Sequence, residues 1–225
     1  SENGGSGGNN RVTRDVYDDF GRLISRSTPD SGRLIQNFDA SGFRTQRKDA
    51  LGNVIQYYYD TANRLVKTNT PSKIDNLSYL YDETGKIGDS GITYANTAGR
   101  LTTVGAHDAD GNPILSHYSY NELGYTVDNV EERGTLTSNF HYVWGENGEL
   151  LSLTYPDEMI VNYEYPASGG YAPRPKPNGI SVTYNGETFS LISDVKYFAD
   201  GVISALTYGN GSTRGLTRNR RGQMS

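Results

Sequence analysis

Residues 108–112 are the part of this sequence that most resembles a metal-binding loop. Oxygen-bearing side chains alternate there at Asp108, Asp110 and Asn112. A calcium loop of the EF-hand type needs glycine at its sixth position and glutamate at its twelfth, but those positions hold Pro113 and Ser119. We therefore interpret the segment as a tight turn around Gly111, and we expect no metal site.

The histidines are the next candidates for chemistry, because a histidine beside a serine or a carboxylate can act as a general base. They are His107, His117 and His141. The sequence contains neither a Gly-x-Ser-x-Gly nor a His-Glu-x-x-His motif. His117 and His141 lie within aromatic runs that are typical of strands, and the carboxylate pairs at 131–132 and 157–158 lie beside turn signals. We expect no catalytic residue and no enzymatic activity.

The composition excludes further classes of chemistry. The absence of cysteine rules out disulfide bonds, a thiolate nucleophile and a Cys-ligated zinc or iron–sulfur site. No apolar run approaches the roughly 20 residues of a membrane helix. The net charge of −5 argues against a nucleic-acid partner, and we interpret the arginines near the C-terminus as solvated side chains. We therefore expect no cofactor, no membrane span and no nucleic-acid binding.

A short motif that returns about every 21 residues is the main organising feature of the chain. An aromatic residue is followed by an aspartate, then by a glycine or asparagine, and then by an apolar run. The clearest copies are Tyr17, Asp18, Gly21, Arg22 and Leu23; Phe38, Asp39 and Gly42; Tyr59, Asp60, Arg64 and Leu65; and Tyr81, Asp82 and Gly85. Weaker copies occur at Tyr94 with Gly99, at Tyr120 with Gly124, and at Tyr142, Tyr163, Tyr184 and Tyr208.

Each copy of the motif predicts a strand, a turn and a second strand. The aromatic residue suits a pleated strand, and the glycine tolerates positive φ in a turn. Similar turns recur half a period later, at Gly32, Gly52, Gly111 and Gly201. We therefore expect two strands and two turns in each period. The longer spacing between Tyr94 and Tyr120 predicts a longer turn or a bulge, and the displaced glycine after Tyr142 leaves the turn type there open.

Aromatic residues also pair two positions apart, which places both rings on one face of a strand. The pairs are Tyr57 and Tyr59, Tyr79 and Tyr81, Tyr118 and Tyr120, Phe140 and Tyr142, and Tyr163 and Tyr165. If the repeats stack in register, these rings form ladders along the sheet. We interpret most of the 18 tyrosines as structural. The alternative is a surface on which exposed rings stack against sugars.

The repeats remove the need for a domain boundary, so we expect a single domain over residues 11–225. Residues 1–10 are rich in glycine and serine and are interpreted as a flexible leader. The alternating prolines in residues 172–179 predict a stiff loop rather than a strand; a docking peptide for a proline-binding module is the alternative. The expected fold class is all-β: a β-solenoid of stacked two-stranded repeats in an open, twisted or spiralling antiparallel sheet.

The motif resembles the YD repeat, also called the Rhs repeat. The match rests on Tyr-Asp-x-x-Gly-Arg-Leu at 17–23, on its variants at 59–65 and 81–87, and on Tyr-Gly-Asn-Gly at 208–211. Proteins with this repeat include bacterial Rhs polymorphic toxins, the shells of insecticidal toxin complexes and the teneurins. The resemblance implies a β-solenoid shell, which in the toxins surrounds a C-terminal toxic domain.

The resemblance also implies the partners. We expect this chain to be a repeat-only piece of such a shell, with the rest of the shell and an encapsulated toxin polypeptide as partners. The parent protein would be secreted or displayed on a bacterial cell surface. Unpaired strands at the first and last repeats predict end-to-end self-association. A carbohydrate-binding or cell-surface-binding module that uses exposed tyrosines is the alternative function.

Overall fold

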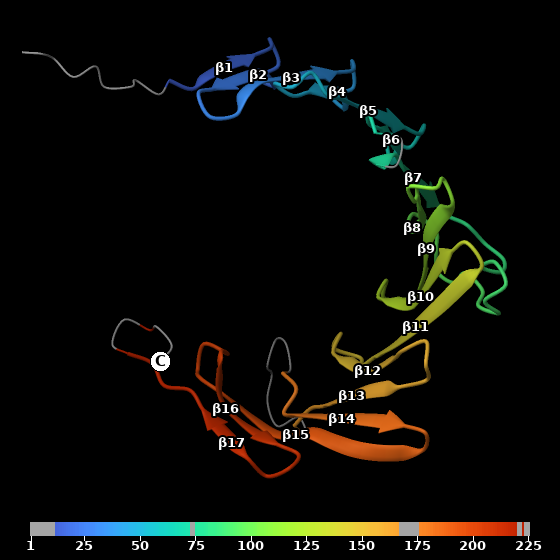
Figure 1. Ribbon diagram of the computed structural model, residues 1–225, viewed down its shortest axis with the longest axis vertical. Coiled ribbons are helices and arrows are strands. Elements are labelled where there is room, and N and C mark those ends of the chain that lie inside the picture. Colours follow the sequence, from blue (N-terminus) through green and yellow to red (C-terminus); the bar gives the residue numbers. More distant parts are fainter. Residues whose placement is uncertain (1–11, 73–74, 167–175, 220–221, 223–225) are drawn as a thin grey trace, which may run out of the picture. The chain divides into compact units, whose positions relative to one another are not determined.

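The computed structural model describes residues 12–72, 75–166, 176–219 and 222. This part of the chain is built of β-strands joined by turns, without an α-helix (Figure 1). Accordingly, no helix in these residues could span a membrane. Hydrogen bonds join 17 strands in one open antiparallel sheet, which confirms the all-β expectation. The expected leader and half of the proline-rich segment, residues 172–175, lie outside the described residues.

The chain divides into two compact units. The first comprises residues 1–80 and 103–114, and the second comprises residues 81–102 and 115–225. Strands wholly or mostly in the first unit are β1 (Arg14–Tyr17), β2 (Leu23–Thr28), β3 (Gly32–Phe38), β4 (Arg44–Lys48), β5 (Val54–Tyr59), β6 (Leu65–Asn69), β7 (Leu77–Tyr81) and β8 (Leu101–His107). Those of the second are β9 (Pro113–Tyr120), β10 (Thr126–Arg133), β11 (Leu136–Trp144), β12 (Leu150–Thr154), β13 (Ile160–Glu164), β14 (Gly179–Tyr184), β15 (Glu187–Tyr197), β16 (Ile203–Tyr208) and β17 (Thr213–Gly215).

The turn of a regular motif closes with two backbone hydrogen bonds. In the first copy, the Asp18 N–H donates to the Arg22 carbonyl and the Gly21 N–H donates to the Asp18 carbonyl, both at 3.0 Å. Gly21 has a φ of +76°, which places the residue after a type I turn in the left-handed region. The Asp18 carboxylate accepts the N–H of Phe20 and that of Arg22. Aspartate therefore begins the turn and glycine completes it.

The same turn recurs along both units. Its first, fourth and fifth residues are Asp39, Gly42 and Phe43; Asp49, Gly52 and Asn53; Asp60, Asn63 and Arg64; Asp108, Gly111 and Asn112; Asn121, Gly124 and Tyr125; and Gly145, Gly148 and Glu149. The candidate calcium loop is thus an ordinary member of this set, and its Asp108 carboxylate accepts the backbone N–H groups of Asp110 and Asn112. The turn left open after Tyr142 is the same turn, begun at Gly145.

Exposure alternates along strands such as β5 and β7, as the sequence predicts. In β5, Tyr57 and Tyr59 are half-buried on one face, whereas Tyr58 between them is 42% exposed. The register of β5 on β6 places Tyr57 opposite Thr68 and Tyr58 opposite Lys67. Consequently, the paired aromatic residues of a strand lie together on one face, and the residue between them lies on the other.

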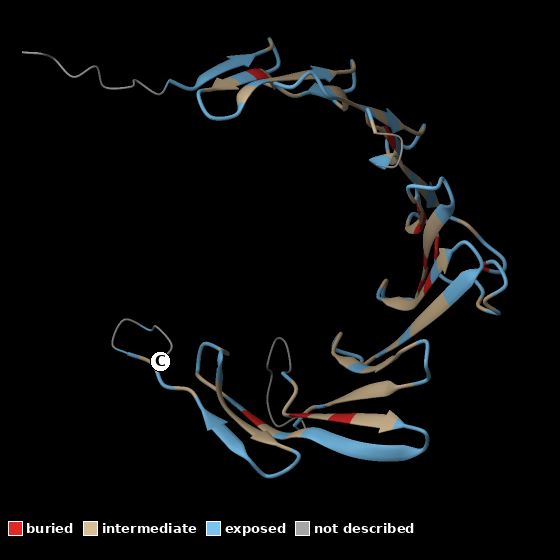
Figure 2. Ribbon diagram, viewed as in Figure 1, coloured by how far each residue is buried: buried red, intermediate tan, exposed pale blue. Residues whose placement is uncertain are grey.

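Very few side chains in the described residues are fully covered, as Figure 2 shows. The buried apolar residues are Ile87, Val130 and Val195. In each unit the stability must come from strand pairing and from side chains that cross between neighbouring strands, because a sheet with two largely open faces lacks a conventional core. The contacts between repeats are therefore the place to look for what the motif residues do.

Candidate functional site

The hydroxyl of the motif tyrosine reaches back to the preceding repeat. Tyr59 Oη donates to the carbonyl of Arg44, 3.0 Å away, at the start of the strand after the previous turn. Equivalent bonds run from Tyr120 to Leu101 (2.6 Å), from Tyr165 to Leu150 (2.9 Å) and from Tyr197 to Pro177 (2.6 Å). Desolvation raises the pKa of each of these four tyrosines, so the neutral, donating hydroxyl is the favoured form.

The structure relocates three of the expected motif residues. Trp144, not Tyr142, takes the aromatic position in β11, where its Nε1–H donates to the Thr126 carbonyl at 2.7 Å. Tyr165 and Tyr197, rather than the expected motif residues Tyr163 and Tyr184, make the bond back to the preceding repeat. Tyr184 and Tyr208 instead begin turns: Tyr184 precedes the two-residue turn of Asn185 and Gly186, both with positive φ, and the Tyr208 N–H donates to Ser212.

The motif arginine reaches forward to the next repeat. Arg22 pairs with Asp18 of its own turn at 2.6 Å. Its guanidinium also lies 4.9 Å from the centre of the Phe38 ring, and Nη1 donates to the Asp39 carbonyl at 3.2 Å. Arg100 lies in the same way 5.5 Å from the centre of the Tyr120 ring. One arginine therefore fastens its own turn and the aromatic residue of the following motif.

An aromatic residue replaces this arginine in other repeats. Phe43 follows Gly42, and its ring centre lies 5.1 Å from that of Tyr59. Tyr125 follows Gly124 and stacks at 5.0 Å on Trp144. The residue after the turn glycine thus packs on the aromatic residue of the next repeat, whether it is an arginine or an aromatic. These contacts differ from the expected ladder of paired rings, because a residue after the turn carries each of them to the next ring.

Glycine in the turn also leaves room for the arginine. A Cβ atom at Gly124 would lie 3.1 Å from Arg100 Nη2, and Gly124 has a φ of +88°. Gly42 has the corresponding place beside Arg22, at 3.7 Å. The glycine of one motif therefore serves both its own turn and the arginine that arrives from the preceding motif.

Arg22→Ala is expected to weaken the coupling between the first two repeats. A partly exposed cation–π contact contributes about 0.5–1 kcal/mol, so a double-mutant cycle of Arg22→Ala with Phe38→Leu should give a coupling free energy of that size. Urea denaturation of the four proteins measures it. Arg47→Ala, on the exposed side of β4, is the matched control. If Arg22→Ala lowered the free energy of unfolding equally in the wild-type and the Phe38→Leu proteins, Arg22 and Phe38 would not be coupled.

The motif at Tyr81 is split by an insertion. The Asp82 N–H donates to the Arg100 carbonyl at 3.2 Å, and the Asp82 carboxylate accepts the Gly99 N–H at 2.5 Å. Gly99, with a φ of +75°, therefore completes the turn that Asp82 begins. The expectation that Gly85 would do so is wrong, since the Gly85 carbonyl instead accepts the N–H of Tyr94. Residues 83–96, here called the insert, lie between the two halves of one turn.

Removing the insert from the sequence restores a regular motif. Residues 81–82 followed by 97–101 read Tyr-Asp-Thr-Ala-Gly-Arg-Leu, and residues 59–65 read Tyr-Asp-Thr-Ala-Asn-Arg-Leu. The two copies that the sequence analysis assigned to Tyr81 and Tyr94 are therefore one. Tyr94 belongs to the insert, and its hydroxyl contacts His117 Nδ1 at 2.7 Å.

The histidines have three different surroundings. His117 in β9 is buried, beside Tyr94 and 3.6 Å from Glu132 Oε2. His141 in β11 is half exposed and lies 2.7 Å from the carboxylate of Asp128 on β10. His107 lines a groove of about 530 Å³ in the first unit. The structure does not bring the three together, and the described residues contain no group of three metal-ligating side chains.

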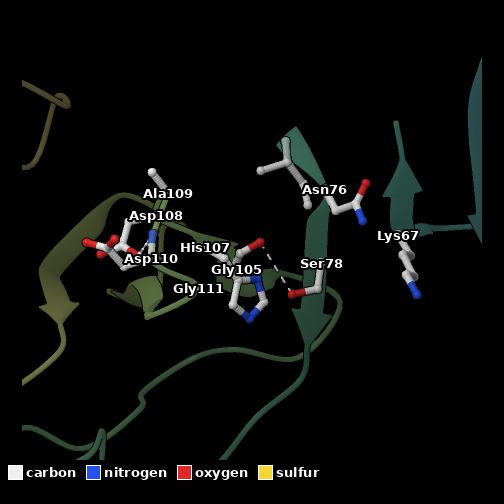
Figure 3. A pocket seen from close by; sticks show the side chains of 10 residues that line it. Lys67, Asn76, Ser78, Gly105, His107, Asp108, Ala109, Asp110 and Gly111 are labelled. Carbon is white, nitrogen blue, oxygen red and sulfur yellow. Dashed lines mark hydrogen bonds between the residues drawn. The ribbon is translucent and has the colours of Figure 1, made fainter. Parts of the chain in front are cut away.

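The groove beside His107 is open and lined mainly by small or polar residues (Figure 3). Ser78 Oγ donates to the Gly105 carbonyl at 3.4 Å across it, and Lys67 lines one end. Tyr58 lies opposite Lys67 in the register of β5 on β6. An exposed ring therefore stands near the Lys67 end of an open groove, and a sugar-binding surface would combine a ring and a groove in this way.

Comparisons with known proteins agree with this geometry. The RHS Repeat family model matches residues 38–73, which contain the Phe38 and Tyr59 motifs. No curated protein matches the sequence. Solved structures that the chain resembles include the TcdB2–TccC3 complex (TM-score 0.72, 15% identity, covering 94% of this chain and 11% of that chain). A Tc holotoxin pore of Photorhabdus luminescens is similar as well (TM-score 0.67, 16% identity, covering 95% and 12%). The chain thus shares their fold over nearly its whole length but spans only about a ninth of theirs.

Proposed function

We propose that this chain, which is a YD/Rhs-repeat protein, is a non-catalytic section of a shell wall whose parent protein encloses or displays another polypeptide. The proposal rests on the contacts that the motif residues make. Aspartate closes the turn, arginine holds the next aromatic ring, and tyrosine binds back to the previous repeat. The side chains most able to do chemistry are thus used to join repeats.

The proposed partners follow from the resemblance and from the similar structures. They are further repeats of the parent shell and an enclosed toxin polypeptide, in a secreted or cell-surface protein. Residues 11–225 act in this proposal as one repeat domain. The outer edge of β1, all of whose residues are exposed, is the surface for end-to-end pairing with a second copy.

A glycan-binding surface is the second candidate. It is favoured by Tyr58, which is 42% exposed and lies opposite Lys67 at the groove beside His107. Tyr184, which is also 42% exposed, is a further ring that a sugar could reach. The two candidates place function on different tyrosines: the wall uses the half-buried rings, and glycan binding uses the exposed ones.

Chemical footprinting of tyrosine in the folded protein separates the candidates. If the chain is part of a shell wall, the half-buried tyrosines should be modified slowly. They are Tyr57, Tyr59, Tyr79, Tyr81, Tyr118, Tyr120, Tyr163 and Tyr165. The wall also predicts fast modification of Tyr17, Tyr58 and Tyr184, and no change when a panel of purified oligosaccharides is added. Protection of Tyr58 by an oligosaccharide would favour the glycan surface.

The same experiment tests end-to-end pairing when it is repeated over a range of protein concentrations. Tyr17 is 55% exposed in the edge strand β1, so association through that edge should slow its modification as the concentration rises. Tyr58, which lies away from the edge, serves as the internal control. A Tyr17 rate independent of concentration would contradict self-association through β1, and fast modification of the paired tyrosines would contradict the wall.

A further inference from the structure

The insert is held on the sheet by a chain of polar side chains. Glu83 Oε2 accepts hydrogen bonds from Thr102 at 2.8 Å and from Tyr94 at 3.2 Å. The Tyr94 hydroxyl also lies 2.7 Å from His117 Nδ1. His117 Nε2 in turn lies 3.6 Å from Glu132 Oε2 on β10. The His117 imidazole thus lies near two carboxylates. Glu132 approaches it directly, and Glu83 is linked to it through the Tyr94 hydroxyl.

These polar side chains lie beside the most deeply buried residues of the second unit. Ile87 of the insert is 1% exposed, and Val130 on β10 is fully buried. The Ser119 hydroxyl, on the same strand as His117, accepts the N–H of Ala95 at 3.0 Å. The insert therefore covers His117 itself, whose residual exposure is 8%, and a proton on that ring would be held among protein groups rather than by water.

Counting protons identifies the state of His117 that suits these contacts. Tyr94 has one hydroxyl proton to donate. If neutral His117 accepts it, Glu83 loses its bond from Tyr94. If neutral His117 is instead protonated on Nδ1, its bare Nε2 faces the Glu132 carboxylate. The imidazolium form donates to Tyr94 from Nδ1, frees Tyr94 to donate to Glu83, and directs its Nε2–H toward Glu132. In that form a donor meets an acceptor at all three contacts.

We propose that the insert is a pH-dependent strap, closed over β9 and β10 by a protonated His117. The titratable groups that face this ring are Tyr94 and Glu83 from the insert and Glu132 from β10. With both carboxylates ionised, protonation of His117 balances one of their two negative charges. Closure takes up a proton, so the strap is favoured at lower pH and is weakened as the pH rises.

Hydrogen exchange of the intact chain tests the strap. Protection factors of the amides in residues 83–96, corrected for intrinsic exchange at each pH, should be higher at about pH 5.5 than at about pH 8.0, since one linked proton changes an opening equilibrium by up to about tenfold per pH unit. His117→Gln should abolish the difference. Tyr94→Phe should also reduce it, because the link between His117 and Glu83 is cut while the ring remains.

His141→Gln is the matched control, because His141 also pairs with a carboxylate but lies 2.7 Å from Asp128, away from the insert. This variant should keep the full pH dependence of the wild-type strap. Equal protection at the two pH values in the wild-type chain, or greater protection at the higher pH, would overturn the proposal. So would a pH dependence that survives both His117→Gln and Tyr94→Phe. These outcomes are independent of the shell function.

Discussion

Gly209→Ala should destabilise the second unit by about 3 kcal/mol, the largest loss expected for a methyl group added at any glycine that the structure describes. A Cβ atom at this position would lie 1.7 Å from the carbonyl oxygen of Ser190, which is a backbone atom and cannot turn aside. The Gly209 N–H also donates to the Leu191 carbonyl at 2.9 Å. The substitution must therefore force β15 and the end of β16 apart.

Urea denaturation followed by tyrosine fluorescence measures this loss, and hydrogen exchange in β15 locates it. Gly215→Ala is the control, because Gly215 lies in the neighbouring strand β17 with no atom within 4 Å of the added Cβ. It should change the free energy of unfolding by no more than about 0.5 kcal/mol. Similar effects of the two substitutions would mean that the close approach at Gly209 is not a constraint.

Ile87→Ala should detach the insert from the sheet. The side chain is 1% exposed, and removal of a buried isoleucine side chain to Cβ costs about 2–5 kcal/mol when the site does not collapse. Because the Asp82 and Gly99 bonds close the turn beneath the insert, the remaining strands should stay paired. Loss of amide protection confined to residues 83–96 is the expected measurement.

Leu123→Ala provides the comparison for Ile87→Ala. Leu123 is 66% exposed at the tip of the Asn121 turn, so its truncation should leave stability within about 0.5 kcal/mol of the wild type. If Ile87→Ala left the protection of the insert unchanged, Ile87 would not be its anchor. Loss of protection throughout the second unit would instead mean that the insert supports the sheet.

The sequence predicts the regular part of this fold well, because turn chemistry is local. Asp18 and Gly21 lie three residues apart, and their hydrogen bonds and φ angles need no information from the rest of the chain. The aspartate carboxylate confirms this locality at Asp60, whose pKa is lowered chiefly by the backbone N–H of Arg64, within the same turn. The turns that begin with aspartate and close three residues later with glycine, as at Asp18, Asp39 and Asp108, can be predicted directly from their residues.

The contacts between repeats could be predicted only in part. The 21-residue period indicates which residues recur, but it does not show that Arg22 crosses to Phe38 or that Tyr59 binds Arg44. The β11–β12 pairing changes register between Val143 and Trp144, as other pairings do just before Tyr17, Phe38 and Tyr59, so the register marks Trp144 rather than Tyr142 as the motif aromatic. Spacing alone cannot place such a shift.

The split motif was missed for a different reason. Asp82 and Gly99 are far apart in the sequence, and the glycine at position 85 imitates the expected turn. A signal was nevertheless present: Thr97-Ala98-Gly99-Arg100-Leu101 repeats Thr61-Ala62-Asn63-Arg64-Leu65 apart from the glycine. The sequence therefore indicates one clear copy at Tyr81 and one weaker copy at Tyr94, where the structure has a single motif.

Because hydrogen bonds join the residues on either side of the insert, this turn is a suitable position for inserting additional sequence. Asp82 and Gly99 remain bonded as though they were neighbours in an ordinary turn, so an added segment needs only ends that meet at a hairpin tip. The entropy of closing a longer loop grows slowly with its length. A chain of this kind can therefore acquire a new peptide at a turn without altering the pairing of any strand, and a tag or binding epitope placed between residues 82 and 97 should be carried in the same way.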